Sequence, residues 1–279
     1  MAVTNDFDDI LALSDREFEQ FRRYIYDHAG ISLGEQKKPL VASRLLKRVK
    51  AQGLRSYGDY FNLVNSQGQE SELQQMVDLL TTHETYFFRE PAHFNYLREH
   101  LLPAFVGRPF RALSAACSSG EEVYSLAMEC AETLGNGDWE VVGSDISQGV
   151  LAQARAALYP MERARGIPRE MLVKYCLKGI RSQEGQLLID PKLARRARFI
   201  YANLKVGLPD QTQYDLIFLR NVLIYFDNHT KADVVGRLVA SLRPGGYLFT
   251  SHVETLHGVT ADLKMIRPSI YRRPPRPGA

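Results

Sequence analysis

The chain of 279 residues has no apolar run near the roughly 20 residues that a membrane-spanning helix needs. Its longest apolar runs, YDLIFL (214–219) and VLIYF (222–226), are separated by Arg220 and Asn221. The first ten residues, MAVTNDFDDI, are acidic and contain no basic region followed by an apolar core, so we expect no signal peptide. These absences predict a cytoplasmic protein that does not insert into a membrane.

Cysteine is also scarce. Cys117, Cys130 and Cys176 are odd in number and show no CxxC spacing, and the seven histidines show no HExxH spacing. This pattern favours reduced thiols over a disulfide framework and predicts no metal site.

The chain also lacks the GxGxxG motif of dinucleotide-binding proteins. The segment LSAACSSGEEVYS (113–125) instead places six small residues and a single glycine, Gly120, between an expected strand and an expected helix. Such a turn can bring a ligand close to backbone N–H groups, although a role in packing alone is the alternative. Asp145 ends the next expected strand, where a carboxylate can accept hydrogen bonds from both ribose hydroxyls or cap the following helix.

Two glutamates, Glu121 and Glu122, open the helix after this turn. A nicotinamide dinucleotide would place its pyrophosphate at that helix N-terminus, where these carboxylates would repel it. S-adenosylmethionine carries a sulfonium and an ammonium group and fits better. The sequence therefore favours this methyl donor over a nicotinamide cofactor.

Residues 10–80 predict an all-helical N-terminal domain. Ser14 with Glu17 forms a capping-box pattern, Gly30 ends that helix, and Pro39 and Gly53 bound the next one. Residues 37–55 hold seven basic side chains and no acidic one, namely Lys37, Lys38, Arg44, Lys47, Arg48, Lys50 and Arg55. They are either a solvated helix surface or a face for an acidic partner.

Residues 81–279 change to alternating strands and helices, which predicts an α/β doubly wound sheet. We expect helices over SQGVLAQARAALY (147–159) and over 231–246, the second closed by Gly245. Two short strand-like runs between 171 and 198 predict an inserted β-hairpin. The tail at 272–279, rich in Pro and Arg, is expected to be disordered.

Several segments together resemble the chemotaxis receptor methyltransferases of the CheR family over nearly the whole chain: TTHETYFFREPAHF, SAACSSGEEVYSLAM, GSDIS, ARAALY, LRNVLIYFD and LRPGGYLFTSHVETL. The resemblance implies a helical N-terminal domain and a Rossmann-like methyltransferase domain with an inserted β-subdomain. It also implies transfer of a methyl group from S-adenosylmethionine to receptor glutamates, with S-adenosylhomocysteine as the second product.

Carried over by motif position, the resemblance implies a set of donor-binding residues: His83, Thr85, Arg89, Glu122, Asp145, Asn203, Leu204, Arg220 and Asn221. Arg89 and Tyr225 are the expected catalytic residues, because they would orient the acceptor carboxylate. His83 stands where the family commonly has Asn and would add a pH dependence. Asp145→Ala is expected to weaken donor binding and leave the fold intact.

The resemblance further implies an acidic acceptor on the cytoplasmic helices of methyl-accepting chemotaxis receptors. Arg44, Lys47 and Arg48 lie three or four residues apart, and we expect them to share or adjoin one exposed face that binds it. A receptor tail peptide could add a strand to the inserted hairpin, but Arg181 stands roughly where members that bind such peptides carry a further glycine. We expect a monomer at receptor arrays that binds no nucleic acid.

Two alternatives remain open. One is an adaptor that binds S-adenosylmethionine without catalysis, and the other is a methyltransferase for a different protein acceptor. A nucleic-acid methyltransferase is disfavoured because the chain has neither a Pro-Cys nucleophile nor an NPPY-like segment.

Overall fold

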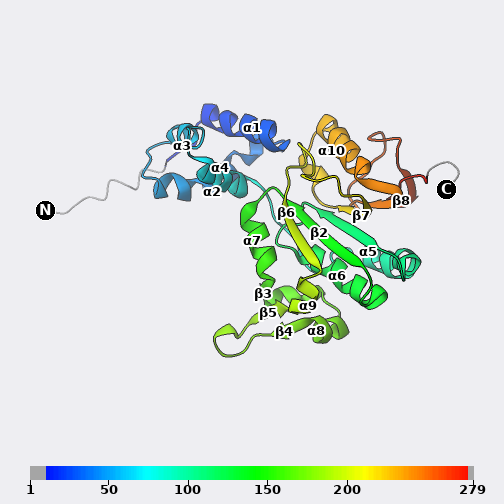
Figure 1. The fold of residues 1–279 in the computed structure, drawn as a ribbon. Helices are drawn as coiled ribbons and strands as arrows, with labels where there is room; N and C mark the ends of the chain where they lie inside the picture. The colour runs from blue at the N-terminus through cyan, green and yellow to red at the C-terminus, as the bar shows by residue number, and fades with distance from the viewer. Residues whose placement is uncertain (1–10, 276–279) are drawn as a thin grey trace. The chain divides into compact units, whose positions relative to one another are not determined.

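The computed structural model describes residues 11–275, and the chain divides into two compact units between Thr82 and His83 (Figure 1). No helix within residues 11–275 is long and apolar enough to cross a membrane.

The N-terminal unit is all-helical, as expected. Ser14 and Glu17 form the predicted capping box, and Gly30 ends the first helix in the left-handed region with φ 75°. Apolar residues at helical spacing, such as Phe21, Ile25 and Leu45, are fully buried in its core. Its helices are α1 (Asp15–Ala29), the 3-10 helix η1 (Glu35–Lys37), α2 (Lys38–Ala51), α3 (Tyr57–Val64) and α4 (Glu70–Leu80).

The expected basic face on α2 is only partly exposed. Arg44 is half-buried and donates hydrogen bonds to the carbonyl oxygens of Leu79 (3.1 Å) and Thr81 (2.9 Å), so it caps the C-terminus of α4. Arg48 is half-buried and pairs with Glu72, while Lys47 is exposed. The expectation of one exposed face shared by all three cations is therefore wrong for Arg44 and Arg48. Arg44 binds carbonyl groups left unpaired at the end of α4, and Arg48 binds the buried carboxylate of Glu72.

Glu72 is the buried acceptor at the centre of this helical unit. Only 5 % of its surface is exposed, and its carboxylate accepts hydrogen bonds from Arg48, from the Tyr60 hydroxyl (2.8 Å) and from Gln52 (2.9 Å). The hydrogen bond from Arg48 is the largest effect that lowers the pKa of Glu72. The group thus stays ionised and holds α2, α3 and α4 together.

The second unit is built on a seven-stranded sheet in the order β6-β2-β1-β7-β8-β10-β9, which confirms the expected α/β class. Neighbouring strands from β6 to β8 run parallel, and β10 and β9 are antiparallel additions. The strands of this sheet are β1 (Phe110–Ala115), β2 (Trp139–Asp145), β6 (Ala197–Tyr201), β7 (Tyr214–Leu219), β8 (Leu242–Phe249), β9 (Lys264–Arg267) and β10 (Ile270–Arg272).

Helices cover the apolar faces of this sheet. Side chains that alternate along the strands, such as Phe110, Val141 and Phe218, share one core with the helix that follows β1. The helices of this unit are α5 (Pro91–Tyr96), the π-helix η2 (Leu97–Leu101), η3 (Leu102–Phe105), α6 (Glu121–Leu134), α7 (Gln148–Ala156), η4 (Met161–Gly166), α8 (Arg169–Tyr175), η5 (Arg181–Gln183), α9 (Pro191–Ala194), η6 (Leu223–Tyr225) and α10 (Asn228–Ala240).

The insertion is a three-stranded antiparallel sheet in the order β3-β5-β4. The hairpin of β4 (Cys176–Lys178) and β5 (Gln186–Ile189) lies within the expected range. The third strand, β3 (Leu158–Pro160), was predicted as the end of a helix. That helix ends at Ala156 because Ala157 takes a left-handed φ of 54° and turns the chain into the insertion.

The C-terminal segment is ordered further than expected. Arg272 lies in β10, and the Arg273 backbone N–H donates to Gly246 O at 2.9 Å, so the expected disorder is wrong for these two residues. Residues 276–279 lie outside the described part of the chain. Gly245 does not close α10, which ends at Ala240; it lies inside β8 with φ 82°.

The Arg48–Glu72 pair generates a stability prediction. Arg48→Met would leave Glu72 buried without its charge-assisted partner, and we expect it to lower the free energy of unfolding by about 2 kcal/mol. Lys47→Met, one residue away and exposed, should change it by less than about 0.5 kcal/mol. Urea unfolding of the full chain followed by circular dichroism measures both, while fluorescence of the single tryptophan, Trp139 in β2, reports separately on the second unit. Equal stability of the two variants would contradict a structural role for Arg48.

Glu129 on α6 generates a pH prediction. It is 1 % exposed, lies 3.1 Å from the guanidinium of Arg98, and burial raises its pKa from 4.5 to about 7. Because the folded pKa is raised, its contribution to stability is complete below pH 4.5 and is lost as the pH rises to about 7. The free energy of unfolding of Glu129→Gln minus that of wild type should therefore be larger at pH 8 than at pH 5. Urea titrations at both values measure this, with the exposed Glu99→Gln as control, and a pH-independent difference would contradict it.

Candidate active site

The candidate site lies at the carboxyl ends of the central parallel strands. β1 lies between β2 and β7, and the chain order of the strands reverses there. Ligands of open α/β sheets bind at such a switch point. Asp145 ends β2, Asn203 and Leu204 follow β6, and Arg220 follows β7, so the topology brings these expected donor-binding residues to one edge.

The turn between β1 and α6 is strained. Ala116, Ser118 and Gly120 have φ angles of 60°, 52° and 93°, which L-residues other than glycine rarely adopt. A Cβ atom on Gly120 would lie 2.8 Å from the Cβ of Ala154 on α7. Gly120 is therefore required by its backbone conformation and by helix packing, which supports the packing alternative for this one residue.

Asp145 organises the same turn. One carboxylate oxygen accepts from Ser118 N and the other from Ser147 N, both at 2.9 Å, and burial raises the pKa of Asp145. The side chain thus joins the turn after β1 to the start of α7. Removal of the carboxylate would leave two buried N–H groups unpaired, so we expect Asp145→Ala to lower the stability of the fold as well.

The two glutamates at the start of α6 have different environments. Glu121 is fully buried, pairs with Arg163 at 2.8 Å and accepts from Ser119 Oγ at 2.7 Å. Glu122 has a side chain that is 13 % exposed and accepts from Ser114 Oγ at 2.7 Å and from Arg220 at 2.9 Å. Only Glu122 is placed to meet a ligand, while Glu121 joins α6 to the insertion.

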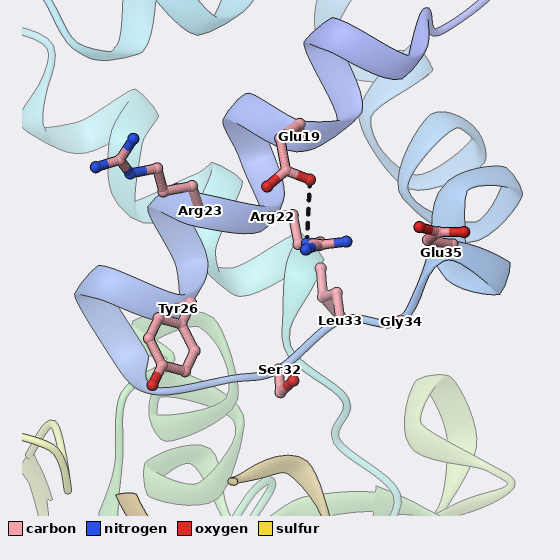
Figure 2. A pocket seen from close by; sticks show the side chains of 8 residues that line it. All are labelled: Glu19, Arg22, Arg23, Tyr26, Ser32, Leu33, Gly34 and Glu35. Carbon is pink, nitrogen blue, oxygen red and sulfur yellow. Dashed lines mark ion pairs between the residues drawn. The ribbon is translucent and has the colours of Figure 1, made fainter. Parts of the chain in front are cut away.

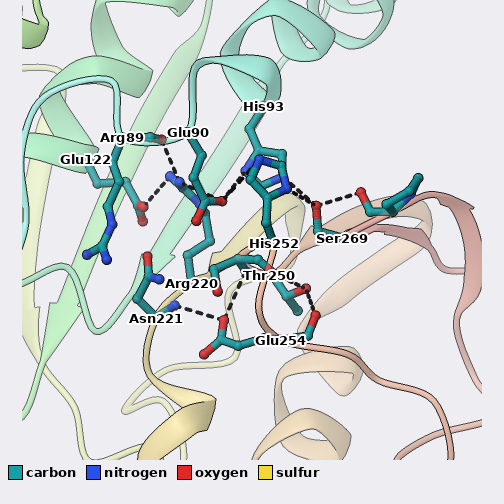
Figure 3. Close-up of polar contacts among 12 residues, drawn as sticks. Arg89, Glu90, His93, Glu122, Arg220, Asn221, Thr250, His252, Glu254 and Ser269 are labelled. Carbon is teal, nitrogen blue, oxygen red and sulfur yellow. Dashed lines mark hydrogen bonds and ion pairs between the residues drawn. The ribbon is translucent and has the colours of Figure 1, made fainter.

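Arg220 is the most heavily bonded cation of the site (Figure 3). Its guanidinium is fully buried and contacts the carboxylates of Glu122 (2.9 Å) and Glu90 (3.1 Å) and the carbonyl oxygen of Arg89 (2.5 Å). It therefore connects β7, α6 and the segment before α5. Burial raises the pKa of Glu122, and Arg220 opposes that rise.

Residues 83–90 form a strap that is held from several elements. The carbonyl oxygen of His83 accepts from Ser118 Oγ at 3.0 Å, and that of Thr85 accepts from Arg163 at 3.0 Å. Phe88 N donates to Ser125 Oγ at 2.9 Å. Phe88 itself has a positive φ of 54°, as does Glu90 with 58°. Backbone hydrogen bonds and the buried Phe87 and Phe88 side chains thus fix the strap against the sheet edge.

Arg89 and Tyr225, the expected catalytic residues, come from different segments of this edge. The guanidinium of Arg89 lies 5.4 Å from the centre of the Tyr86 ring and donates to Glu84 O at 3.0 Å. Tyr225 is half-buried in the turn η6, which follows Arg220 and Asn221.

Glu254 holds that turn in place, and no sequence pattern predicted this role. Its carboxylate is buried and accepts from Asn221 N (2.9 Å), Ile224 N (3.3 Å) and Ser251 N (3.0 Å). Asn221 takes a left-handed φ of 57° there. The only signal in the sequence was the position of Glu254 within LRPGGYLFTSHVETL, since a carboxylate that binds backbone N–H groups leaves no periodic pattern.

Arg163 is a second missed residue. It bridges the buried carboxylate of Glu121 and the carbonyl oxygen of Thr85, and so joins the insertion to α6 and to the strap. Nearby, a Cβ atom on Gly166 would lie 2.1 Å from the Phe87 carbonyl oxygen, so the insertion and the strap pack closely. No local sequence feature predicted this contact, because its partners are about 40 and 80 residues away.

The two residues expected beside the adenine lie at the end of β6. Asn203 and Leu204 are each 8 % exposed, and the Asn203 side chain accepts from Lys205 N at 3.0 Å. The preceding residue, Ala202, donates its N–H to the carbonyl oxygen of Asp145 at 3.0 Å. The ends of β2 and β6 are therefore adjacent, as a nucleoside site between them requires.

A separate pocket of about 500 Å³ lies in the N-terminal unit (Figure 2). Both charge signs line it, including an ion pair between Glu19 and Arg22 at 3.1 Å. The lining residues are Glu19, Arg22, Arg23, Tyr26, Ser32, Leu33, Gly34 and Glu35. None of them is an expected site residue.

Comparison with known proteins identifies the family. Residues 83–271 match the model "CheR methyltransferase, SAM binding domain", where SAM is S-adenosylmethionine, and residues 16–81 match "CheR methyltransferase, all-alpha domain". Among curated proteins, the chain is 39% identical over 266 residues to the chemotaxis protein methyltransferase of Escherichia coli (strain K12), covering 94% of this chain and 92% of that protein. It is 31% identical over 281 residues to that of Borreliella burgdorferi, covering 96% and 98%. The chain belongs to the CheR methyltransferase family, whose larger domain binds S-adenosylmethionine.

Proposed function

We propose that this protein transfers the methyl group of S-adenosylmethionine to glutamate side chains of methyl-accepting chemotaxis receptors, and so forms glutamyl methyl esters and S-adenosylhomocysteine. The relatives named chemotaxis protein methyltransferase support a role in chemotaxis. The observation that carries the proposal is the chemistry of one sheet edge. Carboxylates suited to a cationic donor lie there together with a guanidinium and a phenol suited to a carboxylate acceptor.

The residues at this edge fit S-adenosylmethionine, which supplies a methyl group on a positively charged sulfur. Glu122 offers a partly exposed carboxylate toward positive charge. Asp145 ends β2 beside β6, and its carboxylate accepts from Ser118 N and Ser147 N, with a further backbone hydrogen bond from Ile146. A carboxylate has about four lone pairs, so it can still accept from a ribose hydroxyl. We infer that Glu122 binds the methionine part of the donor, Asp145 the ribose, and Asn203 and Leu204 the adenine.

The acceptor needs no general base. A free glutamate has a pKa of about 4.3 and is ionised at neutral pH. What remains is alignment of the carboxylate oxygen with the methyl carbon and the sulfur, and alignment can supply up to about 7–11 kcal/mol of a barrier. We infer that Arg89 and Tyr225 orient this carboxylate.

Charge complementarity would bring the acceptor to the enzyme. Lys47 and Lys50 lie three residues apart on α2 and are both exposed, so they replace Arg44 and Arg48 as the cations that meet an acidic receptor helix. Such an attraction mainly raises the rate of encounter and is screened over about 8 Å at physiological ionic strength. We infer that the protein acts as a monomer in the cytoplasm at receptor arrays.

The insertion offers a second contact for a receptor. β4 pairs only with β5, so its other edge is unpaired within the described residues. Leu177 in β4 and Ile180 just after it are exposed. An extended receptor tail peptide could add a strand at this edge. Arg181 has a positive φ of 54°, a conformation that glycine adopts at lower cost. The turn therefore keeps the shape of a glycine turn despite the Arg side chain.

The first prediction from this proposal concerns Asp145. Asp145→Ala should weaken binding of S-adenosylhomocysteine by about 10- to 100-fold, because the hydrogen bonding of the carboxylate to the ribose is lost. It should also lower the melting temperature, because Ser118 N and Ser147 N lose their acceptor. Calorimetry below the melting temperature of the variant separates the two effects, with the exposed Asp138→Ala as control. Unchanged affinity would remove Asp145 from the donor site.

The second prediction concerns the product. Incubation with methyl-labelled S-adenosylmethionine and cytoplasmic receptor fragments should give label that mild alkali releases as methanol, since a carboxyl ester hydrolyses and an N-methyl group does not. Fragments with Gln at the acceptor positions should remain unlabelled.

Lys47→Glu with Lys50→Glu should slow labelling and reduce its dependence on salt without weakening S-adenosylhomocysteine binding. Fragments with and without their C-terminal tail test the edge of β4.

Each alternative has its own outcome. Alkali-stable label would identify a different methyl acceptor chemistry. Donor binding without labelling of any fragment would favour a non-catalytic adaptor. A normal rate in the folded double lysine variant would place the acceptor elsewhere than on α2.

A further inference from the structure

Three side chains with metal-binding atoms converge beside Arg220. Glu90 precedes α5, His93 lies on α5, and His252 follows β8, and Figure 3 shows the two imidazoles next to the Glu90 carboxylate. Glu90 Oε2 is 3.3 Å from His93 Nδ1 and 3.8 Å from His252 Nε2. One ligand atom from each of the three lies within 4.8 Å of the others.

Ser269 orients both imidazoles. Its Oγ lies 2.7 Å from His93 Nε2, 3.3 Å from His252 Nδ1 and 2.6 Å from the carbonyl oxygen of Pro268. When the hydroxyl donates to that carbonyl, both rings donate N–H to its oxygen. Each ring then presents a lone pair, at His93 Nδ1 and at His252 Nε2, toward the same oxygen of Glu90. This is the arrangement in which an outer hydrogen bond fixes the tautomer of a metal-binding histidine.

Two of the three converging atoms lack a hydrogen-bond partner. His93 Nδ1 and Glu90 Oε2 are both buried and make no hydrogen bond within the described residues, although Glu90 Oε2 is in ion-pair contact with Arg220 at 3.1 Å. His93 is 1 % exposed, so solvent has almost no access to its ring. In this tautomer a buried lone pair of His93 faces a carboxylate oxygen, which is unfavourable unless a proton or a metal cation lies between them.

We propose that Glu90, His93 and His252 bind one divalent transition-metal ion of the zinc class through Oε2, Nδ1 and Nε2. Tetrahedral zinc with ligand bonds of about 2.0–2.2 Å holds its ligand atoms roughly 3.3–3.5 Å apart. The separation of 3.3 Å between Glu90 and His93 matches this range, and the separation of 3.8 Å between Glu90 and His252 is somewhat longer. Two imidazoles and a carboxylate favour zinc, copper or nickel over magnesium or calcium. The His252 side chain is 48 % exposed, so an ion can enter from solvent, and water can take the fourth position.

Arg220 limits the affinity of this site but does not block it. Its guanidinium lies 3.1 Å from Glu90 Oε2, and its positive charge opposes a second cation. The same oxygen has a second lone pair, and Arg220 keeps Glu122 and the Arg89 carbonyl as partners. The ion would tie the start of α5 to the segment after β8. It would therefore stabilise the segment before α5 that holds Arg220, without contacting the transferred methyl group.

A metal titration tests this assignment independently of methyl transfer. Zinc is titrated by calorimetry into full-length protein without a histidine tag, and cobalt by visible absorption, which becomes intense in tetrahedral coordination. We expect one ion per chain and a zinc-dependent rise in melting temperature. His252→Ala should weaken the binding of both zinc and cobalt at least tenfold. His257→Ala, an exposed histidine five residues away, should bind as wild type does.

Equal affinity of wild type and His252→Ala would overturn the assignment, and so would the absence of binding of either ion at about 100 μM. A cobalt spectrum of octahedral type would also overturn it, because it would contradict the tetrahedral ligand set. None of these readouts requires labelled donor or receptor, so failure here leaves the proposed methyl transfer untouched.

Discussion

The burial of one guanidinium constrains the geometry of the whole site. Arg220 has no solvent to satisfy its charge, so the fold must bring two carboxylates and a carbonyl oxygen to it. Those acceptors come from α6 and from the strap before α5, two segments far apart in sequence. A buried charge without its partners costs several kcal/mol, so the strap and the start of α6 cannot move independently of β7. The same contacts leave Glu122 as the partly exposed carboxylate at the edge where the donor is expected to bind.

Backbone strain is concentrated in the same segments. Five residues other than glycine have positive φ there, namely Phe88, Glu90, Ala116, Ser118 and Asn221. Each such conformation costs of order 1–3 kcal/mol and persists only where the surrounding contacts determine it. Here buried hydrogen bonds do so: Asp145 holds Ser118, Ser125 holds Phe88, and Glu254 holds Asn221. The site is thus a set of strained turns, each held by a polar side chain from another element.

The sequence predicted the parts of this arrangement that follow from periodicity and chain order. Alternating strands and helices were sufficient to place Asp145 at the edge where carboxyl ends of parallel strands meet. Asn203 and Arg220 were expected there only through the resemblance to the CheR family. Periodicity could not distinguish Glu121 from Glu122, since that difference depends on Arg163, about 40 residues away. The prediction of an exposed basic face on α2 failed for a similar reason. A count of local charges did not include Glu72, which pairs with Arg48, or the carbonyl groups at the end of α4, which accept from Arg44.

The placement of Arg89 bears on how a carboxylate could be methylated efficiently. An ionised acceptor and a sulfonium donor become a neutral ester and a neutral thioether, so a strong ion pair with the acceptor would stabilise the starting state more than the transition state. Arg89 already interacts with the Tyr86 ring and with the carbonyl oxygen of Glu84, and it is only half-buried. Solvent and these partners weaken its hold on an anion, whereas the strap fixes its position. The cation that would bind an anion strongly, Arg220, is buried and already paired with Glu90 and Glu122. Under the proposed function, this division would assign charge balance to Arg220 and leave Arg89 to orient the acceptor.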